Sequence, residues 1–431
     1  MWKCRCILVL VLVGISVSAL AAESVEVTFW PRPNPLWVEY WQYMADRYMV
    51  TNPVINGKPV VVKIASMPTK PSSEAAIQMA IAGGTVATGS GNIVTGFGLM
   101  LAKDGHLVPL DELPGFWELM EQRAIADTIR EKWVAPDGHV YTVPNFSNPK
   151  IYAWRIDILR ELGYQHPPRS YSEVFELGRV LKARYPDKFL MVDDRTVDPT
   201  WWKRWGDFFP FYHAFIAAPF VTNNKLTVSD AMVVEVFEFF HGLFDNDLLL
   251  TAKAQDPFPT GLCVWTRINA WDPIKWRDKY PELVFGENYV LSPPVVPDWY
   301  PQDLPIHFFT DEKGIVIYAN ASEEERLAIW DFYRFVLGDP QNDLTYFETT
   351  GVLPSRGDIT TNPILASAIT PETFLWSYAV SVAIPSMAHP KFAEIQEALG
   401  AQGFIPALRG EKPSGRAWAD AKAAIEDLLT E

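Results

Sequence analysis

Segments with the two-residue period of a strand alternate with segments that have the period of a helix over the first hundred residues. Residues 25–29 alternate apolar and polar side chains, as a half-buried strand does. Asn34 and Pro35 then provide a helix N-cap and a first-turn proline. The expected strands are 25–29, 60–64 and 92–94, and the expected helices start at Asn34-Pro35 and span 75–82. This strand–helix–strand order predicts an α/β fold with mainly parallel sheets covered by helices.

The same signals continue along the rest of the chain. Ser170 with Glu173, and Ser322 with Glu325, each have the spacing of a capping box ahead of an apolar helical face. A last amphipathic helix is expected over about 415–429. A chain of 431 residues is long enough for two or three domain-sized units.

The first 21 residues have the pattern of a secretory signal peptide. Lys3 and Arg5 precede an apolar run, and Ala19-Leu20-Ala21 supplies the small residues of a cleavage site. The run is shorter than the ~20 residues of a spanning helix, and no cysteine stands at the cleavage point for a lipid. The mature protein is therefore expected to begin at Ala22, without a lipid anchor, in the periplasm. The alternative is an anchor that stays uncleaved.

The expected mature chain is strongly acidic. Loss of Lys3 and Arg5 leaves 35 Lys and Arg against 52 Asp and Glu, a net charge of −17. Such a balance argues against nucleic acid as a partner, because nucleic-acid-binding surfaces are basic. Cys263 is the one cysteine after residue 21, so no internal disulfide is expected.

Enzyme signatures are missing from the sequence. The seven histidines show no metal-ligand spacing, no glycine-rich stretch completes a nucleotide-binding motif, and G-x-S-x-G does not occur. Asp193-Asp194 is a carboxylate pair, but adjacent loop residues point apart and indicate a solvated turn. We therefore expect no catalytic residue, no metal and no cofactor.

Six short segments occur in an order that carries family information. They are the strand at 25–30, AIQMAIAGGT at 76–85, KDGHLVPLD at 103–111, DGHVYTVP at 137–144, GYQHPPRSYSE at 163–173 and GVLPSR at 351–356. In this order the chain resembles the family 1 extracellular solute-binding proteins of ABC transporters, the maltose-binding-protein-like group. Ser90-Gly91-Asn92-Ile93 and Trp154-Arg155-Ile156-Asp157 depart from the family pattern near the cleft.

The resemblance implies a fold and a division into domains. The expected fold is the two-lobe periplasmic-binding-protein fold of type II, in which hinge strands join two α/β lobes. The N-terminal lobe would comprise 22–144 plus 297–350, and the C-terminal lobe 149–292 plus 356–431. The hinges would lie near 145–148, 293–296 and 351–355, and the protein is expected to be a monomer.

The resemblance also implies that the protein binds and delivers a solute and catalyses no reaction. The protein would capture a carbohydrate, an oligosaccharide, between its lobes and deliver it to ABC-transporter permease subunits in the membrane. One alternative is a non-sugar solute: a basic cleft would favour a glycerol phosphodiester and an acidic cleft a polyamine. The other alternative is a secreted carbohydrate-active enzyme, which would need a convergent pair of buried carboxylates.

Candidate ligand-binding residues follow the strands, because ligands of open α/β sheets lie beyond the carboxyl ends of the strands. In the resemblance, Trp271 has the position of a sugar-stacking aromatic. The alternative for Trp30 and Trp271 is that they pack in the core of a lobe and do not contact the ligand. For Trp376 core packing is favoured. The candidates are Trp30, Arg32, Asn34, Thr95, Phe97, Asn145, Phe146, Trp205, Asp207, Phe208, Arg267, Asn269, Trp271, Trp376 and His389.

Overall fold

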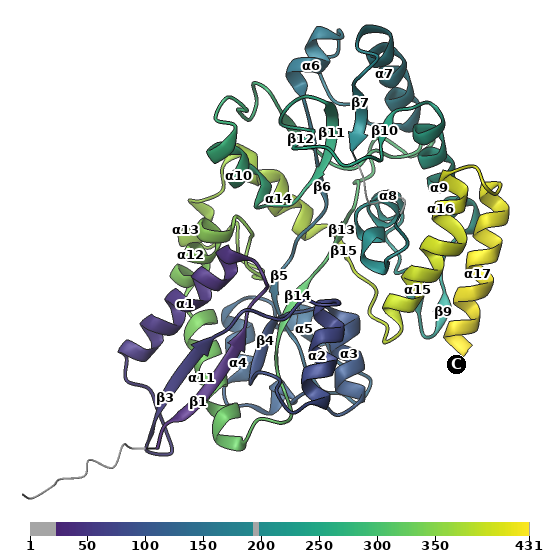
Figure 1. Cartoon of the computed structure of the whole chain (residues 1–431). Coiled ribbons are helices and arrows are strands. Elements are labelled where there is room, and N and C mark those ends of the chain that lie inside the picture. The colour runs from purple at the N-terminus through teal and green to yellow at the C-terminus, as the bar shows by residue number, and fades with distance from the viewer. Residues whose placement is uncertain (1–22, 193–197, 431) are drawn as a thin grey trace, which may run out of the picture.

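The computed structural model describes residues 23–192 and 198–430. The expected signal peptide, residues 1–21, and the Asp193-Asp194 pair lie outside the described residues. The described chain forms two lobes, each built on one β-sheet with helices on its faces (Figure 1). The predicted two-lobe α/β architecture is therefore present.

The sheet of the first lobe has six strands, four of which point the same way. β1, β3, β4 and β5 run in one direction, and β2 and β14 run in the other. Across the sheet the order is β2 (Val54–Ile55), β3 (Lys58–Ile64), β1 (Val25–Trp30), β4 (Gly89–Ile93), β14 (Lys313–Ile317) and β5 (Val143–Phe146). The sheet is mixed because β14 returns from the other lobe and inserts antiparallel between β4 and β5.

The sheet of the second lobe has five strands and the same plan. β7, β10, β11 and β12 run in one direction, and β6 alone runs in the other. The order is β10 (Leu249–Leu250), β7 (Phe189–Val192), β11 (Cys263–Ile268), β6 (Ile151–Trp154) and β12 (Val290–Ser292). Two smaller sheets pair β13 (Phe308–Thr310) with β15 (Ala383–Pro385), and β8 (Val221–Thr222) with β9 (Lys225–Leu226).

Helices cover both sheets (Figure 1). With the first sheet lie α1 (Pro35–Val50), α2 (Ser73–Ala82), α3 (Thr95–Lys103), η1 (Leu110–Glu112), α4 (Phe116–Gln122), α5 (Ala126–Lys132), α11 (Glu323–Leu337), α12 (Pro340–Thr350) and α13 (Pro363–Ala366). With the second sheet and the junction lie α6 (Ile156–Glu161), α7 (Tyr171–Arg184), η2 (Trp201–Trp205), α8 (Phe208–Phe215), α9 (Asp230–Asp245), α10 (Asp272–Lys279), α14 (Pro371–Ser381), α15 (Phe392–Ala398), η3 (Leu399–Phe404), α16 (Ile405–Leu408) and α17 (Ser414–Thr430).

The helix start signals of the sequence are confirmed. The side chain of Asn34 accepts a hydrogen bond from the backbone N–H of Leu36 and caps α1. Both predicted capping boxes form, at the starts of α7 and α11. These local interactions satisfy backbone donors that the first turn of a helix leaves without partners.

β4 begins earlier than the sequence predicts, because glycines at its start give no hydrophobic signal. The apolar pattern predicts a strand over 92–94, whereas β4 spans Gly89–Ile93. A side chain at Gly91 would lie 2.7 Å from the Phe29 ring, and one at Gly89 would collide with the hydroxyl of Tyr333. Close packing of neighbouring elements therefore requires glycine here, and glycine contributes nothing to a hydrophobic pattern.

The chain crosses between the sheets at two places that the strands define. Residues 147–150 connect β5 of the first sheet to β6 of the second, and residues 293–312 lead from β12 back to β14. The bridge between Phe146 and Pro354, and the hydrogen bond from Ser355 N to Asn145 O, fasten 351–355 beside the first crossing. The predicted hinges and lobe boundaries stay predictions.

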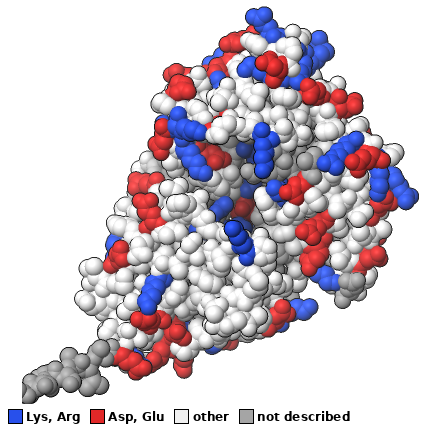
Figure 2. All heavy atoms as spheres, in the orientation of Figure 1, with Lys and Arg blue, Asp and Glu red and all other residues white. Residues whose placement is uncertain are grey.

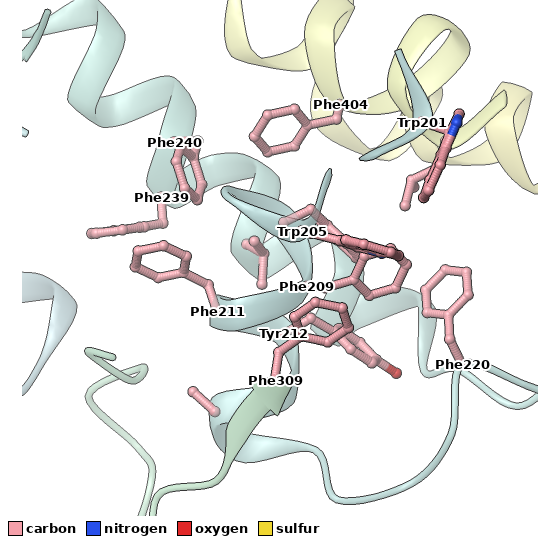
Figure 3. Packing of buried hydrophobic residues seen from close by; sticks show 14 of the residues in the cluster. Trp201, Trp205, Phe209, Phe211, Tyr212, Phe220, Phe239, Phe240, Phe309 and Phe404 are labelled. Atoms are coloured by element: carbon pink, nitrogen blue, oxygen red, sulfur yellow. The ribbon is translucent and has the colours of Figure 1, made fainter. Parts of the chain in front are cut away.

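Aromatic side chains fill much of the second lobe. Figure 3 shows rings from η2, α8, α9 and η3 packed together around Phe211 and Tyr212. Phe208 stacks near-parallel on Tyr212, with ring centroids 5.4 Å apart. The chain has 17 Trp, 16 Tyr and 25 Phe, and among the described residues most of these side chains pack in the hydrophobic clusters, while few line the space between the lobes.

Candidate functional site

A cavity of about 910 Å³ lies between the two lobes. The first lobe contributes the segment after β1, the start of α2 and the start of β14. The second lobe contributes η2 and the end of β11, and the first crossing contributes Asn148 and Lys150. Figure 2 shows charged side chains gathered in a hollow between the lobes. This cavity is the cleft of the molecule, and the loops at the strand ends form it as expected.

A buried ion pair stands at the base of the cleft. The Lys150 ammonium donates to Asp311 Oδ1, and both side chains are about 95% buried (5% and 6% exposed). Asn148 Nδ2 donates to the same oxygen at 2.9 Å and to Asn269 Oδ1 at 3.2 Å. This small network connects the first crossing to β14 and to the second lobe.

Two further cations lie beside this pair. Lys313 is buried, its Nζ lies 5.0 Å from the centroid of the Trp205 ring, and it forms no ion pair with another described residue. The guanidinium of Arg32 lies 4.4 Å from the Trp271 ring and 5.1 Å from the Trp37 ring. Arg32 Nη1 is buried and has no hydrogen-bond partner among the described residues.

Burial and the neighbouring charges set the pKa values of the charged side chains in the cleft. Burial lowers the pKa of Lys150 to about 8, against the attraction of Asp311. Burial also lowers the pKa of Lys313 and that of Arg32. For Asp311, burial raises the pKa, but Lys150, Lys313 and Arg32 outweigh it and the pKa is lowered. The carboxylate is thus ionised, paired with Lys150 and attracted at longer range by Lys313 and Arg32.

Six of the fifteen predicted residues line the cleft. They are Arg32, Asn34, Trp205, Arg267, Asn269 and Trp271. Asn269 is held in place by Asp272, whose Oδ2 accepts from the Asn269 backbone N–H at 2.8 Å and from its Nδ2 at 3.1 Å. Trp271 is 7% exposed and also packs edge-on against Trp37 of the first lobe, with ring centroids 5.5 Å apart.

The other predicted residues lie elsewhere. Five apolar ones are buried in the hydrophobic clusters of the lobes: Trp30, Phe97, Phe146, Phe208 and Trp376. Asp207 caps α8 and pairs with the buried Arg204, and Asn145 Nδ2 donates to Gly91 O at 3.4 Å. Thr95 lines a separate cavity of about 350 Å³ and His389 one of about 810 Å³. Strand-end position alone therefore does not bring a residue into the cleft.

Sequence reasoning missed the charged residues at the centre of the cleft. Lys150 and Asp311 are 161 positions apart, and no local pattern connects them. Asp311 and Lys313 stand at the start of β14, ahead of the apolar run that marks the strand. A usable signal was that Lys150 and Asp311 lie in segments that connect the predicted lobes, where the chain borders the cleft.

Groups that could support chemistry are few in the cleft. Asp311 is the one buried carboxylate among the described residues that line it. No group of three or more His, Cys, Asp or Glu in the described chain could hold a metal ion. Within the same residues, no helix is long and apolar enough to cross a membrane.

The chain matches a protein family over most of its length. A family described as bacterial extracellular solute-binding protein matches residues 35–371. An uncharacterized protein of Listeria monocytogenes has 40% sequence identity and a TM-score of 0.81, over 94% of this chain and 100% of its own. No protein with curated annotation matches.

More distant solved structures share the fold. The GacH receptor of Streptomyces glaucescens, solved without ligand and with acarbose, has 18% identity and a TM-score of 0.75, over 95% of this chain and 99% of its own. The maltose/maltodextrin-binding domain MalE of Bdellovibrio bacteriovorus, solved with maltotriose, has 17% identity and a TM-score of 0.70, over 94% of this chain and 100% of its own. The predicted two-lobe fold is confirmed by these likenesses.

Proposed function

The chain belongs to the family of bacterial extracellular solute-binding proteins, and we propose that the solute it captures in the cleft is a carbohydrate. It is the solute-binding component of an ABC importer, and proteins of this family are not enzymes, as the sequence predicted. The proposal extends to an oligosaccharide ligand, a monomeric protein and a periplasmic location with delivery to the permease subunits.

The size and lining of the cleft support an oligosaccharide. A volume of about 910 Å³ lies in the upper part of the range of small-molecule sites, roughly 300–1,000 Å³. Trp201, Trp202, Trp205 and Trp271 line it, and flat indole faces suit the C–H faces of sugar rings. Asn34, Asn148 and Asn269 add amide groups that can pair with hydroxyls. These tryptophans of the second lobe, facing one cleft with amides from both lobes, are the observation that carries the proposal.

The relatives add support of a weaker kind. GacH binds acarbose and the Bdellovibrio domain binds maltotriose, and at 18% and 17% identity they share the fold rather than the site. The mechanism that follows is capture and closure. A sugar entering the cleft contacts side chains of both lobes, and closure about the crossings buries it.

One alternative solute has a specific observation in its favour. Arg32, Lys150 and Lys313 make the centre of the cleft basic, which would suit the phosphate of a glycerol phosphodiester. The same cations disfavour a polyamine, because like charges repel in a buried site.

Native mass spectrometry of the exported protein, as purified, tests the carbohydrate proposal. A bound mass made of sugar residues, released on unfolding and rebound on refolding, is the expected result. Calorimetric titration of the released compound gives its affinity. A co-purified or rebound solute without a sugar ring would overturn the carbohydrate assignment and leave the family role intact.

A further inference from the structure

The cleft holds more buried positive charge than its own carboxylate balances. Lys150 and Lys313 are buried in it, Arg32 is half-buried beside them with a buried Nη1, and Asp311 is the one buried carboxylate among the described residues that line the cleft. The chain as a whole carries a net charge of −15, so a cluster of cations is the opposite of what the average composition provides. Figure 2 shows acidic side chains spread over the outer surface of both lobes.

Asp311 is already committed to other groups. Lys150 and Asn148 donate to its Oδ1, and neither Lys313 nor Arg32 hydrogen-bonds to it among the described contacts. Lys313 is attracted by Asp311 and Glu74, and Arg32 by Asp311 and Asp272, but at a distance. A buried cation without a hydrogen-bonded counterion destabilises the folded protein, and this destabilisation suggests that an anion from outside completes the site.

The geometry of the free donors matches an oxyanion. Arg32 Nη1 has no partner in the described structure, and a guanidinium presents its donors in a planar fork that fits a carboxylate or phosphate. Lys313 adds a point charge with three donors. Both side chains belong to the first lobe and line the same cavity, and Arg32 is near enough to help lower the pKa of Lys313, so one ligand group can contact both.

Aromatic rings lie directly beside these donors. Lys313 Nζ is 5.0 Å from the Trp205 ring centroid, and the Arg32 guanidinium is 4.4 Å from that of Trp271. A ligand placed here would contact an aromatic ring and a positively charged side chain at the same time. A sugar ring that carries an acidic substituent has this combination of surfaces.

We infer that the solute carries an oxyanion, a carboxylate or a phosphate, which binds between Arg32 and Lys313 beside the Lys150–Asp311 pair. The inference rests on the proposed function in that it concerns the same cleft and names the class of solute, an acidic carbohydrate. The anion supplies the counter-charge that Asp311 alone does not, and it adds selectivity against neutral sugars of the same size.

Matched pairs of acidic and neutral compounds test the inference by calorimetric titration at constant ionic strength. The probes are digalacturonate against galactobiose, glucose 6-phosphate against glucose, glycerophosphoglycerol against glycerol, and maltotriose. At least one acidic probe is expected to bind tenfold or more tighter than its neutral partner. The carboxylate and phosphate arms separate the two sources of the anion. The inference is overturned if no acidic probe binds better than its partner, or if maltotriose binds as tightly as the best acidic probe.

Three variants locate the anion. Lys313→Met should weaken the best acidic probe about thirtyfold or more, since loss of one partner of a buried charge pair has effects of this size. Lys313→Arg should retain most of the affinity. Lys63→Met is the matched control, because Lys63 is an exposed lysine of β3 that pairs with Glu26. Equal weakening by Lys63→Met, or none by Lys313→Met, would contradict the placement.

The outcomes also separate this inference from the carbohydrate proposal. If glycerophosphoglycerol alone binds, and Lys313→Met abolishes its binding, the oxyanion site stands and the carbohydrate assignment fails. If a neutral sugar binds at least as tightly as every acidic probe and Lys313→Met leaves its affinity unchanged, the carbohydrate assignment stands and the oxyanion site fails. A melting curve of unliganded Lys313→Met checks that the variant is folded; removal of an uncompensated buried charge should raise its melting temperature.

Discussion

The guanidinium of Arg32 lies over the Trp271 ring, 4.4 Å from the ring centroid. Arg32 follows β1 of the first lobe, and Trp271 is the N-cap residue of α10 in the second lobe. The contact therefore joins the lobes across one end of the cleft. It also covers one face of Trp271, so that a ligand reaches this residue at its other face or its edge.

Trp271→Ala should weaken sugar binding more than any other single truncation in the cleft. Loss of a buried aromatic anchor costs about 2 kcal/mol or more, roughly a thirtyfold rise in Kd. The free energy of unfolding should fall by less than for Trp41→Ala, the fully buried control, for which about 3–5 kcal/mol is expected. Calorimetric titration and thermal melts measure both. Wild-type affinity with a collapsed melting temperature would assign Trp271 to the core.

Ligand binding should bring the lobes together about the crossings. Residues 145–148, 293–296 and 351–355 are the predicted hinges, and the chain passes between the sheets over 147–150 and 293–312. Small-angle scattering should show a smaller radius of gyration with saturating ligand and an unchanged molecular mass. A radius that stays constant at saturation would rule out closure.

The stability of the protein should fall in mild acid because of His213. Burial lowers its pKa from 6.5 to about 4, against the hydrogen bond between Nδ1 and Ile216 O. The unfolded chain then binds a proton between pH 6.5 and 4 that the folded protein does not, so stability decreases as the pH falls through this window. The loss at pH 5 amounts to about 2 kcal/mol.

Chemical unfolding at pH 7 and pH 5 measures this effect. His213→Gln should lose less stability between the two pH values than the wild type. His166→Gln, at an exposed position, is the matched control and should keep the wild-type difference. The assignment to His213 is wrong if both variants behave alike.

Asp207→Ala should damage the fold rather than the ligand site. Arg204 Nε and Nη2 donate to the two carboxylate oxygens of Asp207 at 3.0 and 2.8 Å, and both side chains are fully buried. Removing one partner of a buried pair costs about 3–5 kcal/mol. Urea denaturation should show this loss, and Asp207→Asn should lose less because its amide oxygen still accepts. A raised Kd with unchanged stability would instead support the predicted binding role.

The exported protein should begin at Ala22 and carry no lipid. The small residues of Ala19-Leu20-Ala21 and the absence of a neighbouring cysteine are the physical basis, since signal peptidase requires small side chains at its cleavage site. Intact-mass measurement after export gives the answer. A mass that includes residues 1–21, or an added diacylglycerol, contradicts the prediction.

Local signals in the sequence were sufficient for elements that have a helix cap, a capping box or a clear hydrophobic period. The alternation at 25–29 becomes β1, the Asn34 cap starts α1, and the Ser322–Glu325 capping box starts α11. These features depend on residues within a few positions of one another, so a pattern can detect them. The start of β4, residues 89–91, escaped detection because the glycines that it needs for close packing carry no hydrophobic signal.

The candidate site was predicted only in part. Position after a strand correctly brought Arg32, Arg267 and Trp271 to the cleft, because strand ends meet there. The same argument selected Phe208 and Trp30, but both side chains are buried in a hydrophobic cluster. A pattern of residue types does not distinguish an aromatic side chain that faces a cleft from one that faces a neighbouring helix.

The sequence by itself determined the α/β class, which follows from short-range periodicity and caps, and the family with its two-lobe architecture, which follow from the resemblance that motifs in a fixed order carry. Only the tertiary structure decided which charges meet. Lys150 and Asp311 are separated by 161 positions, and Lys313 becomes an uncompensated cation only after the lobes have buried it. The energy of a charged side chain depends on its distance from other charges and from water. Both distances are set by packing between segments that are remote in the chain.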